Sequence, residues 1–259
     1  LALNTFNITT GGDGYNVAVG TSAGGAVTTG VRNTIMGGLA GDALTDADLN
    51  VAIGYNSLSS DTLGSGSVAI GQGTLHTQNF TTATTTHNIA IGYNAGGAVT
   101  TGIENTLIGS LAGDALTDAD FNVAVGASAL SLDTLGSRTT AIGLGALQNQ
   151  NFTTATDTYN VAIGFQAGHD VTTGVKNILV GGLAGDAITD ADENVAIGYA
   201  ALGADTLGSK STAIGHQTLA TQNFTTATET FNTAVGHFAG YAVTTGIQNT
   251  ILGGLAGSS

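Results

Sequence analysis

The pattern of apolar and polar residues is set by one five-residue sequence phrase that recurs along the whole chain. The phrase reads Asn-Val-Ala-Ile-Gly or a close variant, and it occurs fourteen times. Val, Ile, Leu or Met stands directly before each closing glycine, and the residue before that is Ala, Ile or Leu. Because successive side chains of a strand point to opposite faces, the phrase predicts a short β-strand that is apolar on both faces. We expect the position directly before the closing glycine to be buried in every strand.

The spacing between these strands is also periodic. The sequence intervals between successive closing glycines are 17, 17, 17 and 21, and the series then begins again, which gives a 72-residue super-repeat. A fixed period is typical of a solenoid whose coils contact only their neighbours. We therefore expect residues 1–259 to form a single all-β, parallel β-solenoid of 17- and 21-residue coils. The closing glycines are Gly20, Gly37, Gly54, Gly71, Gly92, Gly109, Gly126, Gly143, Gly164, Gly181, Gly198, Gly215, Gly236 and Gly253.

A strand that is apolar on both faces must be covered on both. One face can form the inside of the chain's own solenoid, whereas the other requires a partner along its whole length. Identical chains around a common axis meet this requirement by closed symmetry, so the pattern predicts a self-associated fibre. The chain has no Pro, which suits uninterrupted strand pairing, and its 41 Gly suit tight corners. Both ends fall inside a repeat, so we expect an interior fragment of a longer protein.

Polar positions of the repeat predict ladders that connect the coils. Asn opens the phrase in eleven of the fourteen coils. Stacked Asn side chains can bond to one another and to backbone groups at the corners, so we interpret them as structural. Thr recurs at the eighth position after a closing glycine, and we interpret it in the same way. Examples are Thr28, Thr45, Thr62 and Thr100.

Composition argues against several classes of partner and site. The chain carries 4 Lys and Arg against 18 Asp and Glu, a formal net charge of −14. Such a surface repels phosphate backbones and anionic lipids, so we expect no nucleic-acid partner and no membrane contact by this segment. Without Cys, no disulfide or cysteine nucleophile can form. The five His share no single register and the glycine-rich phrases lack the Lys of a phosphate loop, so we expect no enzymatic activity.

Twelve of the eighteen acidic residues recur at fixed coil positions. In one interpretation they bind Ca²⁺, because this cation prefers several carboxylate and carbonyl oxygens. Their spacing differs from the calcium-loop signature, however, and no other cofactor is indicated. In the interpretation that we favour, they bond to their own backbone at corners and keep the fibre soluble. The candidate calcium ligands are Asp42, Asp46, Asp48, Asp61, Asp114, Asp118, Asp120, Asp133, Asp186, Asp190, Asp192 and Asp205.

Each 21-residue coil contains an insertion rich in Thr, such as Thr-Thr-Ala-Thr at residues 81–84. Regularly spaced Thr on a flat face would indicate an ice-binding solenoid, but this segment occurs once in four coils, about 19 Å apart at the usual strand spacing. We expect the insertion to bulge outward as a loop, anchored from beneath by Phe80, Phe152 and Phe224. These loops are where we expect contact with a surface glycan or a protein receptor.

Two of the phrases point to a known family. Ser-Val-Ala-Ile-Gly at residues 67–71 and Asn-Val-Ala-Ile-Gly-Tyr-Asn-Ser at residues 50–57 resemble the YadA-like head repeat of trimeric autotransporter adhesins and related repeats of phage tail fibres. The resemblance covers the chain from about Asn16 to Gly253. It implies a left-handed parallel β-roll, a parallel homotrimer around one axis, no enzymatic activity and a role in extracellular attachment. Adhesin heads of this kind usually have shorter coils, which favours a tail fibre.

These observations predict a structural or adhesive segment of an extracellular appendage. We expect a phage tail fibre that presents or spaces a host-binding tip, located on the virion. One alternative is the head of a bacterial trimeric adhesin on the cell surface that binds host or matrix surfaces. An alternative of another class is an ice-binding β-solenoid, which would be a monomer with a flat, regular Thr face.

Overall fold

The computed structural model describes residues 14–259, which form an all-β parallel solenoid of about fourteen turns. The first thirteen residues of the predicted solenoid lie outside the described residues. Residues 14–259 contain no helix, and hence none long and apolar enough to span a membrane. The coils fall into two compact units, one ending at Ala124 and one running from Val125 to Ser259.

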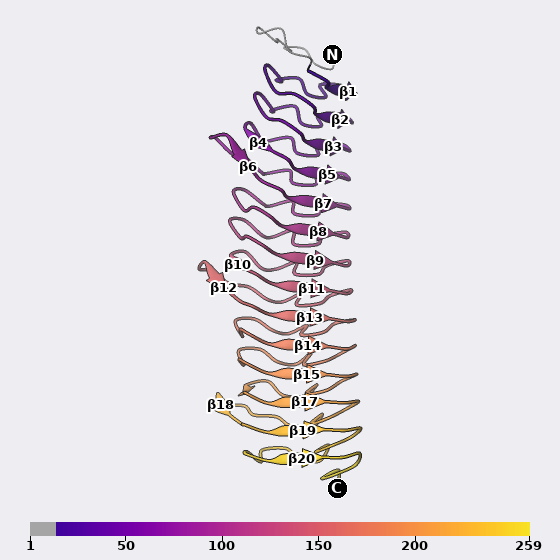
Figure 1. Cartoon of the computed structure of the whole chain (residues 1–259), viewed down its shortest axis with the longest axis vertical. Helices are drawn as coiled ribbons and strands as arrows, with labels where there is room; N and C mark the ends of the chain where they lie inside the picture. Colours follow the sequence, from indigo (N-terminus) through magenta and orange to yellow (C-terminus); the bar gives the residue numbers. More distant parts are fainter. Residues whose placement is uncertain (1–13) are drawn as a thin grey trace. The chain divides into compact units, whose positions relative to one another are not determined.

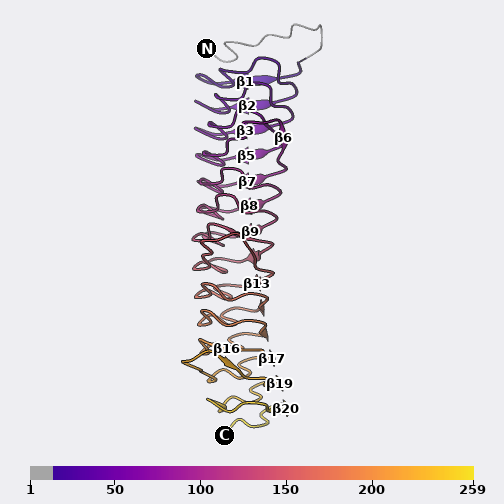
Figure 2. The same ribbon diagram turned by 90° about the vertical axis from the view of Figure 1, so that its left-hand side faces the viewer.

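In the first unit, each coil contributes one three-residue strand that pairs in parallel with the strand of the next coil (Figure 1). Figure 2 shows the same stacking from the side. Most partners are separated by one 17-residue coil, such as Val51 and Val68, whereas Val68 pairs with Ile89 across a 21-residue coil. The strands are β1 (Val17–Val19), β2 (Thr34–Met36), β3 (Val51–Ile53), β5 (Val68–Ile70), β7 (Ile89–Ile91) and β8 (Thr106–Ile108), followed by β9 (Val123–Val125).

The second unit repeats this arrangement. Its three-residue strands are β11 (Thr140–Ile142), β13 (Val161–Ile163), β14 (Ile178–Val180), β15 (Val195–Ile197), β17 (Thr212–Ile214), β19 (Thr233–Val235) and β20 (Thr250–Leu252). Each pairs in parallel with the next in this order. The parallel β-solenoid predicted from the phrase is thereby confirmed.

In each described 21-residue coil, a second and shorter strand pairs with one in the preceding 17-residue coil, at the opposite side of the coil from the three-residue strands. Figure 1 shows these short strands to the left of the three-residue strands. The pairs are β4 (Gly64–Ser65) with β6 (Thr84–Thr85), β10 (Gly136–Ser137) with β12 (Thr156–Asp157), and β16 (Gly208–Ser209) with β18 (Thr228–Glu229). The insertion is therefore an ordered loop that projects beside the short pair.

The inside of the solenoid is lined by the central residue of each three-residue strand. Ala52, Ala90 and Ala196 are fully buried, and so are the larger Ile35 and Leu107 at the same position. The residues on either side point outward and remain partly exposed, so the prediction of a buried residue before each closing glycine is wrong for the single chain. The alternation itself is as predicted, but the small Ala side is the one that fits inside.

Interior side chains compensate for one another in size. Around the buried Ile35 the neighbouring interior positions are Gly41 and Leu44, and a Cβ on Gly41 would overlap the Leu44 side chain. In the next coil the small Ala52 is accompanied by the fully buried Leu58. Leu58 has a left-handed φ of 50°, a conformation that costs about 1 kcal/mol or more outside Gly. The narrow interior thus fixes where large and small residues can stand.

The closing glycines allow consecutive backbones to approach closely. At Gly181 the backbone has a φ of +134°, and a Cβ would lie 2.5 Å from the carbonyl oxygen of Gly198 in the next coil. Side-chain Cβ atoms essentially never come within 3.0 Å of backbone atoms. Only Gly therefore fits both the conformation and the spacing at this corner.

The predicted Asn ladder is confirmed. In one rung the Oδ1 atom of Asn33 accepts a hydrogen bond from the backbone N–H of Asn50 over 2.9 Å, and its Nδ2 donates to the carbonyl of Ala47 over 2.8 Å. Asn50 in turn bonds to Gly64 and to the backbone N–H of Ser67. Each buried amide therefore satisfies backbone groups that the corner leaves unpaired.

The predicted Thr ladder is also present. The Thr45 hydroxyl donates to the carbonyl of Thr62 over 3.1 Å, and the Thr62 hydroxyl donates to the carbonyl of Phe80 over 2.8 Å. Equivalent bonds connect Thr28 with Thr45 and Thr100 with Thr117. These hydroxyl groups are used to join coils.

Replacing a closing glycine should destabilise the fold far more than replacing its neighbour. We expect Gly181→Ala to lower the free energy of unfolding by about 3 kcal/mol, through backbone strain and overlap with Gly198. The adjacent Gly182 is the matched control, because its Cβ would come no closer than 3.6 Å to Tyr199. Thermal melts followed by circular dichroism measure both variants, and equal melting temperatures would contradict the close-approach explanation.

Candidate functional site: the outward sheet face and its edges

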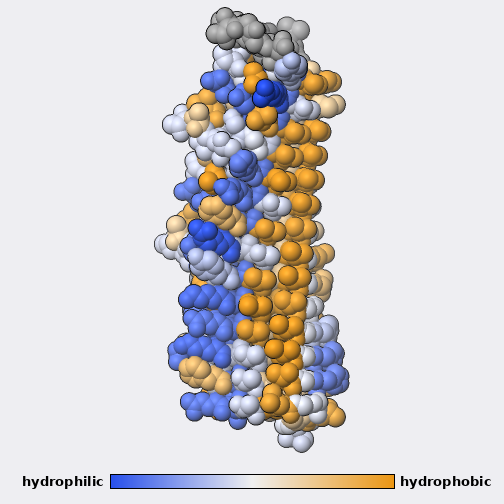
Figure 3. Space-filling view, in the orientation of Figure 1, coloured by the Kyte–Doolittle hydropathy of each residue, from blue (hydrophilic) through white to orange (hydrophobic). Residues whose placement is uncertain are grey.

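The outward side chains of the three-residue strands form an apolar surface on each unit. They make two rows, one from the first and one from the third residue of each strand, and we call this surface the outward face. Figure 3 shows it as orange columns at the position of these strands. The rows consist mostly of Val, Ile and Thr, and the exposed members include Ile89, Ile91, Ile163, Ile178, Ile197 and Ile214.

The outward face leaves much apolar area in water. Ile163, Ile197 and Ile214 each keep between 36 and 38% of their surface exposed, although a strand side chain in a covered sheet is buried. Full burial of an aliphatic side chain contributes about 1.5–3 kcal/mol, so covering the remaining third contributes about 0.5–1 kcal/mol per residue. A surface that repeats this in coil after coil has the composition of an interaction site.

One edge of the outward face carries every cationic residue of the chain. All four stand at the second position before a strand, at a corner with a left-handed φ between 58° and 63°. They are Arg32, Arg138, Lys176 and Lys210. Sequence reasoning missed this placement, although the shared register, directly before the Asn or its substitute, was visible in the repeat.

Three of these cations form ion pairs in the second unit. Arg138 Nε lies 3.0 Å from Asp157 Oδ1, Lys176 lies 3.6 Å from Glu193, and Lys210 contacts Glu229. The hydrogen bond to Glu229 raises the pKa of Lys210, so its ammonium stays charged. Because solvent screens exposed pairs of this kind, they define a polar rim more than they stabilise the fold.

The opposite edge of the outward face carries aromatic rings in the second unit. Tyr199, His216 and His237 each follow a closing glycine, and their rings stack with centroids 5.5 and 5.1 Å apart. Phe238 packs edge-on against both His rings, and Tyr241 packs against Phe238. The residue type at this position varies from coil to coil, and the stack becomes visible only when consecutive coils are placed in register.

Nine of the twelve candidate calcium ligands lie near corners and differ in their contacts. The Asp48 carboxylate accepts the backbone N–H of Val31 over 2.7 Å, and Asp120 and Asp192 accept the equivalent N–H groups over 2.8 Å. Thr hydroxyls donate to Asp46, Asp118 and Asp190 across one coil. These six contacts are corner chemistry between neighbouring coils. The other three corner residues are Asp42, Asp114 and Asp186.

Asp42, Asp114 and Asp186 occupy a less polar environment. Burial raises the pKa of all three carboxyl groups. The Oδ1 atoms of Asp42 and Asp114 are buried without a hydrogen-bond partner. Asp42 also lies within electrostatic range of His76, whose Nδ1 is 2.8 Å from the Ser59 hydroxyl. These carboxylates therefore cost stability when they are ionised.

The last three candidates are fully buried and belong to a polar network of the 21-residue coils. Asp61 Oδ1 accepts the backbone N–H groups of Gly64 and Phe80, and its Oδ2 accepts Gln78 Nε2 over 2.6 Å. Gln78 Oε1 then accepts Asn88 Nδ2 over 2.9 Å. Asp133 and Asp205 repeat this arrangement. Sequence reasoning missed the network, although Asp61 and Gln78 occupy one register.

The structure thus distributes the twelve Asp over three environments. Within residues 14–259, no three His, Cys, Asp or Glu side chains come together as a metal site would require. The buried Asp61, Asp133 and Asp205 already use both carboxylate oxygens in hydrogen bonds to protein groups. Calcium binding stays a prediction that a solution measurement must decide.

The loops of the 21-residue coils are anchored as predicted. Phe80, Phe152 and Phe224 are only 6–7% exposed, and their backbone N–H groups bond to the buried Asp of the preceding coil. The Thr and Ala residues that follow each Phe are exposed. The loop is therefore held rigidly at its base while its tip stands in solvent.

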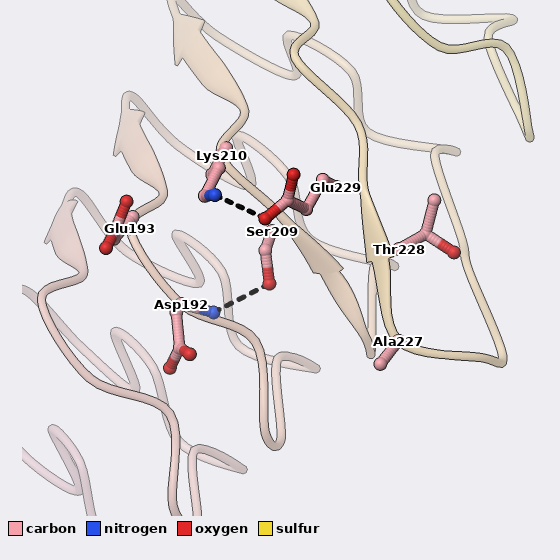
Figure 4. A pocket seen from close by; sticks show the side chains of 7 residues that line it. All are labelled: Asp192, Glu193, Ser209, Lys210, Ala227, Thr228 and Glu229. Atoms are coloured by element: carbon pink, nitrogen blue, oxygen red, sulfur yellow. Dashed lines mark hydrogen bonds and ion pairs between the residues drawn. The ribbon is translucent and has the colours of Figure 1, made fainter.

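A hollow of about 250 Å³ lies beside the last of these loops. Figure 4 shows the Lys210 ammonium directed at Glu229 and the Ser209 hydroxyl bonded to the backbone N–H of Asp192. Glu193 and Thr228 also line the hollow. Lys210 is held by Glu229, and its ammonium lies 5.5 Å from the centroid of the Phe231 ring. The hollow is therefore a part of the polar rim that opens to solvent.

Comparisons of the chain with protein-family models, with curated proteins and with solved structures found no match.

Removing the buried charge of Asp114 should stabilise the protein at neutral pH. A carboxyl group with a raised folded-state pKa favours folding while protonated, and this contribution is lost as the pH rises through that pKa. We expect Asp114→Asn to raise the melting temperature at pH 7 and to have no such effect well below pH 3.8, where the carboxyl group is protonated in both the folded and the unfolded state. The exposed Asp118→Asn is the control, and the same gain at both pH values would contradict the burial explanation.

Calcium should leave the thermal stability unchanged if the acidic residues serve corners only. A ligand that binds the folded state alone raises its stability in proportion to the logarithm of ligand concentration. We expect melting curves in millimolar CaCl₂ and in EDTA to coincide. A melting temperature that rises with CaCl₂ and falls with EDTA would instead assign Ca²⁺ to the Asp groups.

Proposed function

We propose that the chain is a structural segment of a homotrimeric fibre in an extracellular appendage, with a phage tail fibre as the preferred carrier. Its role is mechanical, since it presents or spaces a host-binding tip, and it has no catalytic centre. In this proposal the segment contacts other copies of itself and, through its loops, a surface glycan or a protein receptor. Neither nucleic acid nor a membrane is a partner.

The exposed outward face is the observation that carries the proposal. Two parallel rows of Val, Ile and Thr side chains stand out from each unit, and no part of the same unit covers them. In a three-fold arrangement the third-residue rows of the three chains can meet around the common axis, and the first-residue row of each chain can then pack against a neighbour. Charged corners on one edge and aromatic rings on the other supply the polar rim and anchors that protein interfaces combine.

The ladders support a mechanical role. Asn and Thr side chains join each coil to the next, and the buried Asp network secures the larger coils. Unfolding one coil therefore breaks bonds in both neighbours, which favours a stiff and cooperative stack. The 72-residue super-repeat would then place a projecting loop at regular intervals along the fibre.

The head of a bacterial trimeric adhesin is the alternative carrier for the same trimeric segment. The resemblance to YadA-like repeats applies to both carriers, and the 17- and 21-residue coils favour the tail fibre because adhesin heads usually have shorter ones. An ice-binding function is less favoured. The hydroxyl groups of the regular Thr row donate hydrogen bonds to carbonyls of the next coil and are thus not available to ice. The exposed outward face is aliphatic in most coils.

The trimer is tested by light scattering on the purified chain. We expect the molar mass of three chains, unaffected by EDTA. The double variant Ile197→Asp with Ile214→Asp places two charges on the outward face, and we expect it to yield monomers because burying an unpaired carboxylate costs several kcal/mol.

The matched control is Leu132→Asp, which changes a 50% exposed Leu that does not belong to the three-residue strands. We expect this variant to remain trimeric. Circular dichroism must show the same β-sheet spectrum for all three proteins, so that dissociation is separated from unfolding. A wild-type monomer would overturn the proposal, as would equal effects of the outward-face and control variants.

A further inference from the structure

One sequence motif, which the proposed fibre does not use, recurs in the loops. It is Asn-x-Thr, the acceptor sequence for N-linked glycans, and it occurs four times, once in each 72-residue super-repeat. Only four of the nineteen Asn of the chain belong to such a motif. They are Asn79, Asn151 and Asn223, and also Asn7, which lies outside the described residues.

The structure places the three described motifs at the same point of the three loops. Asn79 is exposed between the buried Gln78 and the buried Phe80, and the Thr of its motif, Thr81, is exposed as well. Because its two neighbours are anchored inside, the Asn side chain is held on the solvent side. Asn151 and Asn223, with Thr153 and Thr225, have the same exposure.

The amide nitrogen Nδ2 of each Asn, the atom to which a glycan would be attached, is available. The Thr62 hydroxyl, which donates to the Phe80 carbonyl over 2.8 Å, also lies 3.2 Å from Asn79 Oδ1, and the Thr206 hydroxyl lies at the same distance from Asn223 Oδ1. Asn151 is bonded to Thr134 over 3.3 Å. No hydrogen bond from Nδ2 of these three Asn to another described residue is present. The oxygen of each amide thus lies beside a Thr hydroxyl of the preceding coil, whereas the nitrogen has no hydrogen bond to a described residue.

The Asn residues of the ladder form a direct contrast. Asn50 and Asn194 are fully buried, and their Nδ2 atoms donate to carbonyls over 2.9 Å. None of the ladder Asn is followed by Ser or Thr at the second position. Acceptor sequence and acceptor geometry therefore coincide at the loops and are both absent from the ladder among the described coils.

We infer that Asn79, Asn151 and Asn223 are sites of N-linked glycosylation. In this step a transferase brings the Asn amide nitrogen to the anomeric carbon of a glycosyl diphosphate donor. A bond forms between that carbon and Nδ2, the bond from the carbon to the diphosphate oxygen breaks, and the diphosphate leaves with the electron pair. The amide proton passes to a base of the transferase, and nothing is oxidised or reduced.

A glycan at these positions is compatible with the rest of the molecule. In each unit the loops project on the side of the coil that lies away from the three-residue strands and their outward face (Figures 1 and 3). A hydrophilic chain on Nδ2 would cover the loop tip and leave the outward face, the ladder and the buried Asp network untouched. The inference does not depend on the proposed trimer. It requires that the chain pass through a secretory pathway, which a cell-surface carrier does and a tail fibre assembled inside its host cell does not, and a glycan on the loop tip would take the place of the receptor contact proposed for these loops.

Two measurements on the full chain test it. The first uses the protein from the cells that make it, and the second uses the chain secreted through a eukaryotic pathway that contains an oligosaccharyltransferase. Cleavage after Lys and Arg separates the three sites, because residues 33–138, 139–176 and 211–259 each contain one of them. We expect mass spectrometry to find a hexose or N-acetylhexosamine increment on these peptides in both samples.

Adjacent threonines provide a matched pair of variants. Thr153→Ala destroys the motif but keeps Asn151, whereas Thr154→Ala changes the next exposed Thr and keeps the motif. We expect the increment on residues 139–176 to disappear in Thr153→Ala and in Asn151→Gln and to persist in Thr154→Ala. As a control for folding, the glycans are removed from each variant and from the natural chain, and equal melting temperatures then show that all variants are folded.

Three outcomes would overturn the inference. Unmodified peptides from the native source would show that the sites are not used, and unmodified peptides from the secretory pathway would show that the loop is not an acceptor. An increment that persists in Asn151→Gln would place the sugar on a hydroxyl group and not on the amide nitrogen.

Discussion

The narrow interior of the solenoid is the constraint on which the rest of the structure depends. A Cβ on the interior Gly41 would lie only 2.8 Å from the Leu44 side chain and 3.4 Å from Ile35. The inward position of each strand accordingly holds Ala in most coils, and a larger residue such as Ile35 fits only where Gly41 makes room. The bulkier Val and Ile side chains must then point outward, which creates the exposed face of the single chain.

The same constraint explains which sequence predictions succeeded. The strands, the coil lengths and both ladders follow from local periodicity, and Phe80 was identified as an anchor because an insertion must be tied down. The inward face could not be predicted, because a strand apolar on both sides has the same pattern in either orientation. Asp61 was grouped with surface acids by residue type, whereas its burial depends on Gln78 and Asn88 in other coils.

Each unit has sides with different chemistry. The outward face is aliphatic and bounded by ion pairs such as Arg138 with Asp157, whereas the loops present Thr, Ala and the free amide nitrogen of Asn151. In the proposed fibre, the first side would be covered by other chains and the second would face the surroundings. The ladders join each coil to the next and so keep the two surfaces in fixed register.

Cross-linking between copies tests the proposed association through the outward face most directly. The natural chain has no Cys, so a single Ile197→Cys variant can form a disulfide only between chains. In a parallel trimer the same position of each chain lies at the same height near the axis, and we predict that mild oxidation yields covalent dimers of Ile197→Cys but none of Leu132→Cys. Absence of cross-links at residue 197, or equal cross-linking at both positions, would contradict association through this face.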